Sequence, residues 1–425
     1  MTAHLRPLRI ATAILTTLLG LATSAADNST GNTMTGIFDP EFRTLTIAVD
    51  GNRLAPPVIT LGSSDRLVIG FDALRDDRDY LRYSITHCDA SWRPSALAAP
   101  EYVDGFNEGV VDDFAYSEAT AVPYTHYRLC FPTPDMMPKL SGNYLLRIYP
   151  ENDPDDTWAQ VRLLVSEQTA GVSADLTSRT DVDYNDAHQQ LELSVDVERA
   201  GVSDPFNELI VAVQQNGRYD SERTLRHPLR ASRTVAVYEH QPELIFEAGN
   251  EYRRFETVNV NYPGMGVENI SWAEPYYHFT LAVDEPRAET PYAYDSTQSG
   301  RYLVRVQGSD DSAVAADYGV VHFALAMDEL PGAMVFIDGD LTSRRFDSEA
   351  LMQYNPATRL YERAMLLKQG SYNYQYLIVP QGARRGYTAQ VEGDFHPTRN
   401  EYTIKVYHRA PGARYDRLIA VALIR

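Results

Sequence analysis

The sequence predicts an all-β protein made of immunoglobulin-like or early-set β-sandwich domains in series. Two patterns support this. Apolar residues alternate with polar ones in short runs bounded by Gly, Pro, Asn and Asp, and no long segment has the 3.6-residue period of an amphipathic helix. The third observation is length. A chain of 425 residues exceeds what one apolar core serves, so about three domains are expected.

A short motif occurs three times and opens a strand each time. It consists of glycine, any residue, tyrosine and an alternating run, and it begins at Gly142, Gly300 and Gly370. In an immunoglobulin-like sandwich, a tyrosine that opens a late strand donates its hydroxyl to the backbone at the preceding corner. We therefore expect such corners at Tyr144 and Tyr302. The alternative is an ordinary tyrosine-rich strand, and for the third copy the expectation rests on a resemblance described below.

The N-terminus has the pattern of an export signal over residues 1–26. Arg6 and Arg9 precede an apolar run at 10–22, and small residues follow that suit cleavage after Ala26. No cysteine stands directly after this site, which excludes a lipid anchor there, and no later segment is apolar for long enough to span a bilayer. We expect a soluble periplasmic protein without membrane insertion.

The charge balance is strongly acidic. Removing the leader takes away two of the 38 basic residues and none of the 58 acidic ones, which leaves a net charge of −22. Such a surface repels nucleic acid and anionic lipid. The two cysteines, Cys88 and Cys130, lie in predicted strands. An oxidising compartment would allow a disulfide, and two buried free thiols are the alternative.

The first predicted domain spans 27–168, and its seven strands suffice for one sandwich. Thirty residues without clear periodicity, 94–123, separate the fourth strand from the fifth. Because this segment is rich in aromatic residues, we expect an ordered loop that either binds a partner or covers a sheet edge. The predicted strands are 43–49, 57–61, 66–74, 80–89, 124–132, 142–150 and 159–167.

The second and third predicted domains span 169–315 and 316–425. An acidic, small-residue segment at 308–317 suggests the joint between them. The strands of the second domain are predicted at 188–197, 208–220, 243–249, 253–262, 276–284 and 301–307. Those of the third are predicted at 320–327, 333–339, 359–367, 371–379, 401–409 and 417–424.

The sequence contains no recognisable catalytic motif. A nucleophile elbow, a phosphate-binding glycine loop, a His-Glu-x-x-His zinc motif and a Cys-x-x-Cys pair are all missing. His87 and Cys88 are adjacent, but neighbours in a strand point to opposite faces and cannot act together. Four histidines stand singly in predicted strands and are expected to be packing or surface residues: His126, His188, His278 and His322. We expect no catalysis and no cofactor.

One segment imitates a calcium-binding loop. Residues 338–349 place Asp338, Asp340, Thr342 and Glu349 at ligand positions of an EF-hand. The sixth position, however, is Ser343 instead of glycine, and the flanking segments are predicted strands. An acidic surface turn without metal is the preferred interpretation.

The third domain resembles the early-set sandwich of glycogen-binding modules and starch-debranching enzymes. The likeness lies in VVHFAL, MVFIDGDLTS and LLKQGSYNYQYLI, and it supports the corner expected at Tyr372. Those modules bind sugar by stacking exposed aromatic rings on it. Because Trp92, Trp158 and Trp272 all precede the predicted third domain, we expect the fold without glucan binding.

Read as a whole, the chain resembles the plug protein family of the type IX secretion system of Bacteroidetes. The resemblance covers nearly all of residues 43–425 in order. It is carried by LGSSDRLVIGFDAL (61–74), RDYLRYSITHCDASWRPS (78–95), EYVDGFNEG (101–109), PYTHYRLCFP (123–132), LSGNYLLRIYP (140–150), DPFNELIVAVQQNGRYD (204–220), LLKQGSYNYQYLI (366–378), EGDFHPTRNEYTIKVYHR (392–409) and PGARYDRLIAV (411–421).

The resemblance implies a non-enzymatic periplasmic protein. It would bind the periplasmic opening of the outer-membrane β-barrel translocon and keep the pore shut when no cargo passes. A periplasmic glycan-binding protein that uses the third domain is the alternative function. As partner-binding residues we select Tyr102, Phe106 and Phe114 of the 94–123 segment, with the alternative that these rings only pack the loop down.

Overall fold

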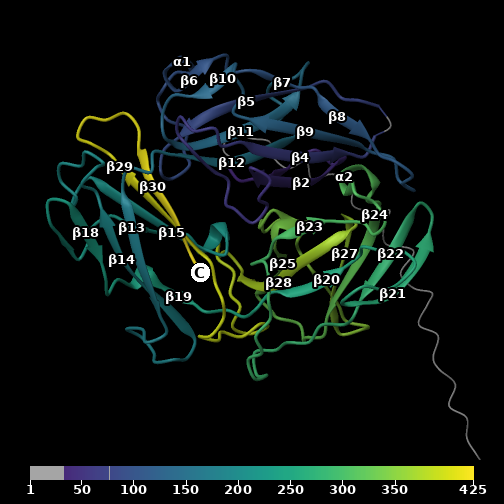
Figure 1. Cartoon of the computed structure of the whole chain (residues 1–425). Coiled ribbons are helices and arrows are strands. Elements are labelled where there is room, and N and C mark those ends of the chain that lie inside the picture. Colours follow the sequence, from purple (N-terminus) through teal and green to yellow (C-terminus); the bar gives the residue numbers. More distant parts are fainter. Residues whose placement is uncertain (1–32, 76) are drawn as a thin grey trace, which may run out of the picture. The chain divides into compact units, whose positions relative to one another are not determined.

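The strands form three two-sheet sandwiches, each with its own apolar core (Figure 1). This arrangement is seen in a computed structural model that describes residues 33–75 and 77–425. The predicted all-β class is confirmed. The predicted export signal lies outside the described residues. Within the described part of the chain, no helix is long and apolar enough to cross a membrane.

The first sandwich contains all seven strands predicted for it. One sheet runs in the order β1 (Gly36–Ile37), β12 (Ala159–Ser166), β11 (Gly142–Pro150), β5 (Leu81–Cys88) and β7 (Gly109–Val111), with β3 (Val58–Thr60) parallel to β12. The other runs β2 (Phe42–Val49), β4 (Leu67–Ala73), β9 (Thr125–Phe131) and β8 (Asp113–Tyr116). Tyr144, Leu146 and Ile148 alternate along β11 and are fully buried in the core, as the period-two pattern predicts.

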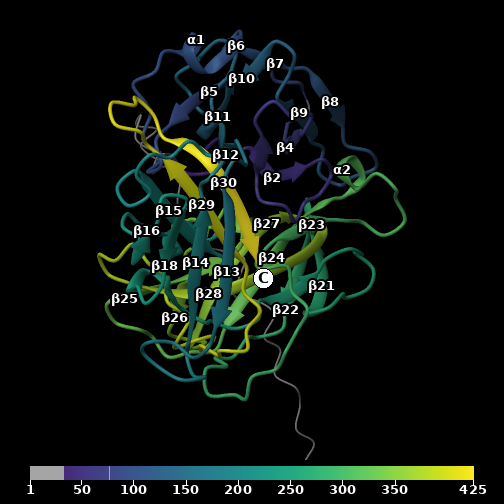
Figure 2. The same ribbon diagram turned by 60° about the vertical axis from the view of Figure 1, so that its left-hand side comes forward.

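The second sandwich is closed by the last strands of the chain. Its first sheet runs β13 (Gly171–Thr177), β14 (His188–Asp196), β18 (Val235–Tyr238) and β17 (Arg230–Ala231), with β19 (Ile245–Glu247) on β14. Its second sheet runs β16 (Arg223–Leu225), β15 (Leu209–Gln215), β29 (Tyr402–His408) and β30 (Arg417–Ile424). Figure 2 shows β29 and β30, in yellow, beside the teal β15.

In the sequence, the strands of the third sandwich come after β19 and before β29, and so between the two groups of strands that form the second sandwich. One sheet runs β20 (Arg253–Glu256), β28 (Gly370–Pro380) and β23 (Tyr302–Val304), with β25 (Ala333–Asp338) also on β28. The other runs β21 (Val267–Ala273), β22 (Tyr276–Leu281), β24 (Tyr318–Leu325), β27 (Leu360–Lys368) and β26 (Gln353–Asn355). Two short helical segments flank these strands: α2 (Ser312–Ala315) and the 3-10 turn η3 (Asp340–Thr342).

This pairing differs from the predicted division at residue 315. The predicted strands 401–409 and 417–424 exist, but they pair with β15 of the second sandwich, whereas the strands between 253 and 304 belong to the third. The alternation of apolar and polar residues along a strand predicts which of its side chains are buried. It does not predict which other strand pairs with it. The central strand β15 is buried throughout, and its second neighbour comes from almost 200 residues later.

The tyrosine motif forms a corner in two of its three copies. The Tyr144 hydroxyl donates to the carbonyl oxygen of Leu140 at 2.8 Å, and Tyr372 donates to that of Lys368 in the same way. The second copy differs, because the Tyr302 hydroxyl donates to the carbonyl oxygen of Leu45 in the first sandwich, at 2.8 Å. In this copy, the tyrosine motif therefore links two sandwiches and does not form a corner within one.

Candidate functional site

The aromatic segment 94–123 covers sheet edges of the first sandwich. The helix α1 (Ala99–Tyr102) leads into β6 (Val103–Gly105), which pairs with β10 (Met136–Pro138). Then β7 extends one sheet at β5, and β8 extends the other at β9. Pairing satisfies backbone groups that an uncovered edge would expose. The backbone of segment 94–123 therefore covers sheet edges, which is one of the two alternatives expected from the sequence. Only its outward-facing side chains are left to contact a partner.

The three residues selected from the sequence do not come together on one surface. Tyr102 is buried: its hydroxyl donates to the carbonyl oxygen of Ile85 at 3.2 Å, and its ring packs against Tyr144. Phe106 is 73% exposed. Phe114 is half-buried against the core cluster. Of the three, only Phe106 and Phe114 offer surface to a partner.

The structure brings other residues to Phe114. The Arg78 guanidinium lies 4.4 Å from the centre of the Phe114 ring and 5.1 Å from that of Tyr80. Tyr116 packs edge-on against Phe114, with ring centres 5.7 Å apart. Tyr80 and Tyr116 are 67% and 53% exposed. We call Arg78, Tyr80, Phe114 and Tyr116 the aromatic patch.

The chemistry of the aromatic patch suits protein recognition. Tyrosine and arginine dominate the energetics of protein interfaces, since they combine large contact area with hydrogen-bonding groups. The Nε atom of Arg78 is buried and has no hydrogen-bond partner among the described residues. Sequence reasoning missed Arg78 and Tyr80 because they precede Phe114 by more than thirty positions; the signal available was only their place in a charged loop beside a strand.

A buried carboxylate joins the first sandwich to the third. Asp72 on β4 is fully buried and accepts hydrogen bonds at 2.6 Å from the Tyr318 hydroxyl and from Lys368 Nζ; His126 Nδ1 lies 2.6 Å from its other oxygen. Burial lowers the pKa of Lys368, and its ammonium lies 4.0 Å from the centre of the Tyr124 ring. All these groups have partners, so the cluster fits a structural link.

The other sandwich pairs are joined as well. An apolar cluster that includes Trp92 and Leu145 of the first sandwich packs against Ile210 and Tyr407 of the second. The Tyr407 hydroxyl donates to Asn143 Oδ1 at 2.7 Å. Between the second and third, the Arg301 guanidinium lies 2.5 Å from the Glu401 carboxylate.

The remaining sequence candidates stay apart or are engaged. His87 and Cys88 point to opposite faces, into separate clusters, as predicted. Cys88 and Cys130 are both free thiols. In the loop that imitates a calcium site, the buried Asp338 accepts from Gln375 Nε2 at 2.8 Å. No group of three or more metal-ligating side chains is found in residues 33–75 and 77–425.

Two histidines expected to stand singly are paired. His278 on β22 and His322 on the parallel strand β24 lie 2.8 Å apart between Nδ1 and Nε2, with stacked rings. Burial lowers the pKa of both.

Trp272 lies in the third sandwich, whereas the sequence-based division placed it before the third domain. It lies on β21 and therefore in the third sandwich, 50% exposed and beside Tyr277, with ring centres 4.7 Å apart. The third sandwich therefore does carry an exposed tryptophan, contrary to the sequence-based expectation.

Comparison with known proteins identifies the first sandwich. Residues 42–167 match the model of the type 9 secretion system plug protein 1st domain, from the start of β2 to just past the end of β12. The whole chain is similar to a hypothetical protein from Parabacteroides merdae, known from a crystal structure. Identity is 40%, the TM-score is 0.91, and the match covers 92% of this chain and 99% of that one.

Two further comparisons add nothing to the assignment. An alkylpurine DNA glycosylase from Pseudomonas fluorescens, bound to DNA with an abasic site analogue, aligns over 29% of this chain and 30% of its own at 11% identity. Its TM-score of 0.19 carries no argument. Curated protein sequences gave no match. From the match of its first sandwich, the chain belongs to the type IX secretion system plug protein family.

Proposed function

We propose that this protein is a non-enzymatic periplasmic plug, which binds the periplasmic opening of the outer-membrane translocon of the type IX secretion system and seals its pore when no cargo passes. The observation that carries the proposal is the match of residues 42–167, which hold nearly all of the first sandwich, to the plug family model. The strongly acidic composition agrees with a protein that keeps away from anionic lipid and recognises a protein partner.

The links between sandwiches support a sealing role. A plug that bent at its domain boundaries would leak, so its domains must hold their arrangement. Separating the first and third sandwiches would leave Asp72 and Lys368 without their ion pair. Both side chains are buried, so this boundary would have to open to water before the pair could separate. The protein can therefore close a pore as one body.

The aromatic patch is the surface we assign to the translocon. It lies on the first sandwich, the part that matches the family model, and carries the exposed rings of Tyr80 and Tyr116. The first test is affinity purification of the tagged mature protein from native membranes in mild detergent. The translocon should co-purify, and adding the mature protein to translocon-containing bilayers should lower their ion conductance. Absence of both effects would refute the proposal.

Matched variants locate the contact. Tyr80→Ser/Tyr116→Ser should reduce recovery of the translocon at least about tenfold, since interface tyrosines commonly contribute more than 1 kcal/mol each. Tyr184→Ser/Tyr262→Ser is the control, because these tyrosines are similarly exposed, at 65% and 72%, on the other sandwiches. A Phe106→Ser arm tests the remaining exposed residue of the sequence-based selection. Equal recovery by the patch and control variants would remove the patch from the proposal.

A glycan-binding role is the second candidate, favoured by the exposed Trp272 beside Tyr277. Sugar stacking on Trp272 would change tryptophan fluorescence on titration with soluble glucans, and Trp272→Ala would abolish the change. The plug proposal expects no saturable change.

A further inference from the structure

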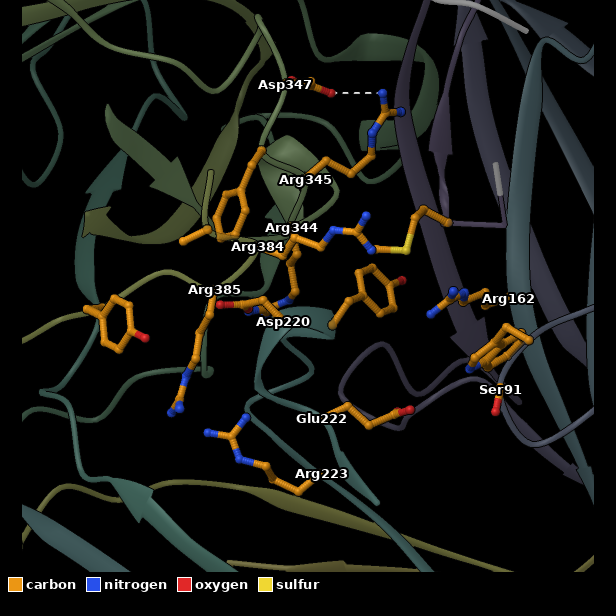
Figure 3. Close-up of a pocket in the computed structure, with 16 residues that line it drawn as sticks. Ser91, Arg162, Asp220, Glu222, Arg223, Arg344, Arg345, Asp347, Arg384 and Arg385 are labelled. Atoms are coloured by element: carbon orange, nitrogen blue, oxygen red, sulfur yellow. Dashed lines mark ion pairs between the residues drawn. The ribbon is translucent and has the colours of Figure 1, made fainter. Parts of the chain in front are cut away.

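A cavity of 810 Å³ lies where the three sandwiches meet (Figure 3). Each sandwich contributes side chains to its wall, so no single domain contains it. The wall combines aromatic rings with guanidinium groups, and it includes Trp92 and Arg162 from the first sandwich, Tyr219 and Arg223 from the second, and Arg344 and Arg385 from the third.

The wall is basic, although the chain as a whole has a net charge of −20. Three carboxylates line the cavity: Asp220, Glu222 and Asp347. Against them stand six arginines: Arg162, Arg223, Arg344, Arg345, Arg384 and Arg385.

All three carboxylates already have cationic partners. Asp220 accepts both Nε and Nη2 of Arg218, at 3.1 and 2.6 Å. Glu222 is paired with Lys405, which lies outside the wall. Asp347 is paired with Arg345 at 2.9 Å.

Two more arginines of the wall use carboxylates outside it. Arg344 lies 2.8 Å from Asp340, and Arg385 is paired with Glu247. The Nε atom of Arg385 is nevertheless buried without a hydrogen-bond partner among the described residues.

Three arginines remain without a carboxylate within ion-pair distance, among residues 33–75 and 77–425: Arg162, Arg223 and Arg384. Arg162 is stacked between the rings of Trp92 and Tyr219, and its guanidinium donates to Thr33 through Nε and Nη2. Arg223 faces the Phe246 ring at 5.8 Å. Arg384 is exposed.

Two of the three unpaired arginines, Arg162 and Arg223, lie in surroundings that disfavour their charge. Burial lowers the pKa of Arg162. For Arg223, burial lowers the pKa and the nearby Arg385 lowers it further, whereas Glu247 and Asp220 raise it. Figure 3 shows Arg223 and Arg385 reaching the same side of the cavity from different elements. A partly buried guanidinium without a carboxylate partner destabilises the folded state.

We propose that this cavity is a binding site for a small multivalent anion with phosphate or carboxylate groups. Guanidinium groups bind both in bidentate fashion, and a ligand with two or more charges can bind more than one arginine of the wall. A single chloride cannot span such groups. Because the acidic surface repels anions at long range, binding depends on the local arginines. The ligand would also contact all three sandwiches and stabilise their arrangement.

The test is calorimetric titration of the mature protein with pyrophosphate and, separately, with citrate, at physiological ionic strength set with sodium chloride. Saturable binding of either supports the site, and preference between the two identifies phosphate or carboxylate as the ligand group. Arg223→Gln/Arg384→Gln should weaken binding at least about tenfold, the loss of charge-assisted hydrogen bonds. Arg230→Gln, a 64% exposed arginine of the second sandwich, is the matched control.

Thermal unfolding separates a ligand site from a structural role. Without ligand, Arg223→Gln should melt no lower than the wild type, because an unpaired charge is removed; a structural arginine would lower the melting temperature when replaced. Arg384→Gln keeps the test valid if the double variant folds poorly, since this residue is exposed. No saturable binding by the wild type, or equal binding by the cavity variants and Arg230→Gln, would overturn the proposal.

Discussion

At the scale of the residue, burial decides the chemistry of adjacent side chains. His87 is fully buried, with Nε2 3.2 Å from the carbonyl oxygen of Ser141 and Nδ1 3.0 Å from Ser95 Oγ. Burial lowers its pKa, so the ring is neutral at neutral pH. Burial raises the pKa of Cys88 to about 12, so its thiolate does not form there. Two neighbours that suggest a nucleophile and base are thus packing residues.

The buried His87 predicts a loss of stability in acid. Its folded-state pKa lies below the ordinary value of 6.5, so the unfolded chain takes up the proton first as the pH falls. Its contribution is complete above pH 6.5 and is lost as the pH falls toward the folded-state pKa. Urea unfolding should show the wild type losing free energy of unfolding relative to His87→Gln over this window. A constant difference between the two proteins would contradict the assignment.

Which residues face the core could be predicted from the sequence, whereas their partners could not. Alternation correctly separated His87 from Cys88, yet nothing local showed that His278 meets His322 or that Arg78 lies against Phe114. The candidate partner site was therefore predicted only in part. Segment 94–123 is ordered, as predicted. Tyr102, however, lies in the core, because the short helix α1 turns its ring inward.

At the scale of the element, one motif has two structural uses. Tyr144 and Tyr372 fasten a strand to its own corner, whereas Tyr302 reaches another sandwich. The difference lies in what stands near the hydroxyl, and that is tertiary information. The strands themselves follow from period-two patterns, which act locally. Their pairing depends on contacts between distant segments, so the division at residue 315 failed while the strands at 401–409 and 417–424 were found.

The corner at Tyr144 predicts a modest stability effect. Tyr144→Phe removes the hydrogen bond to the half-buried Leu140, so the free energy of unfolding should fall by about 1 kcal/mol. Chemical denaturation measures the change. The exposed Tyr262 provides the control, since Tyr262→Phe should leave stability unchanged. Equal behaviour of the two variants would argue against a stabilising corner.

At the scale of the whole molecule, buried polar links hold the sandwiches together. Lys368 connects two of the features described above: its ammonium binds Asp72 of the first sandwich, and its carbonyl oxygen accepts from Tyr372 at the corner of the third. A displacement of Lys368 at the boundary between the first and third sandwiches would therefore also shift the Tyr372 corner inside the third.

Asp72→Asn should be among the most destabilising single substitutions in the chain. It leaves the Lys368 ammonium buried without its counter-charge, which costs about 3–5 kcal/mol. Denaturant unfolding measures this cost. In Asp72→Asn/Lys368→Met the unpaired charge is gone, and part of the loss should be recovered. If the two substitutions instead add their costs, the ion pair is not what holds these sandwiches together.

Because β29 and β30 are synthesised after the strands of the third sandwich, the second sandwich can fold completely only once the third has been made. The core of the second sandwich needs Tyr402, Ile404 and Ile419 beside residues such as Leu191, so more than 200 intervening residues must be made before it can close. During that time the apolar flank of β15 stays open, a template for wrong pairing that a holding chaperone would need to shield. A nascent chain stalled after the third sandwich would carry two finished domains and one half-built one.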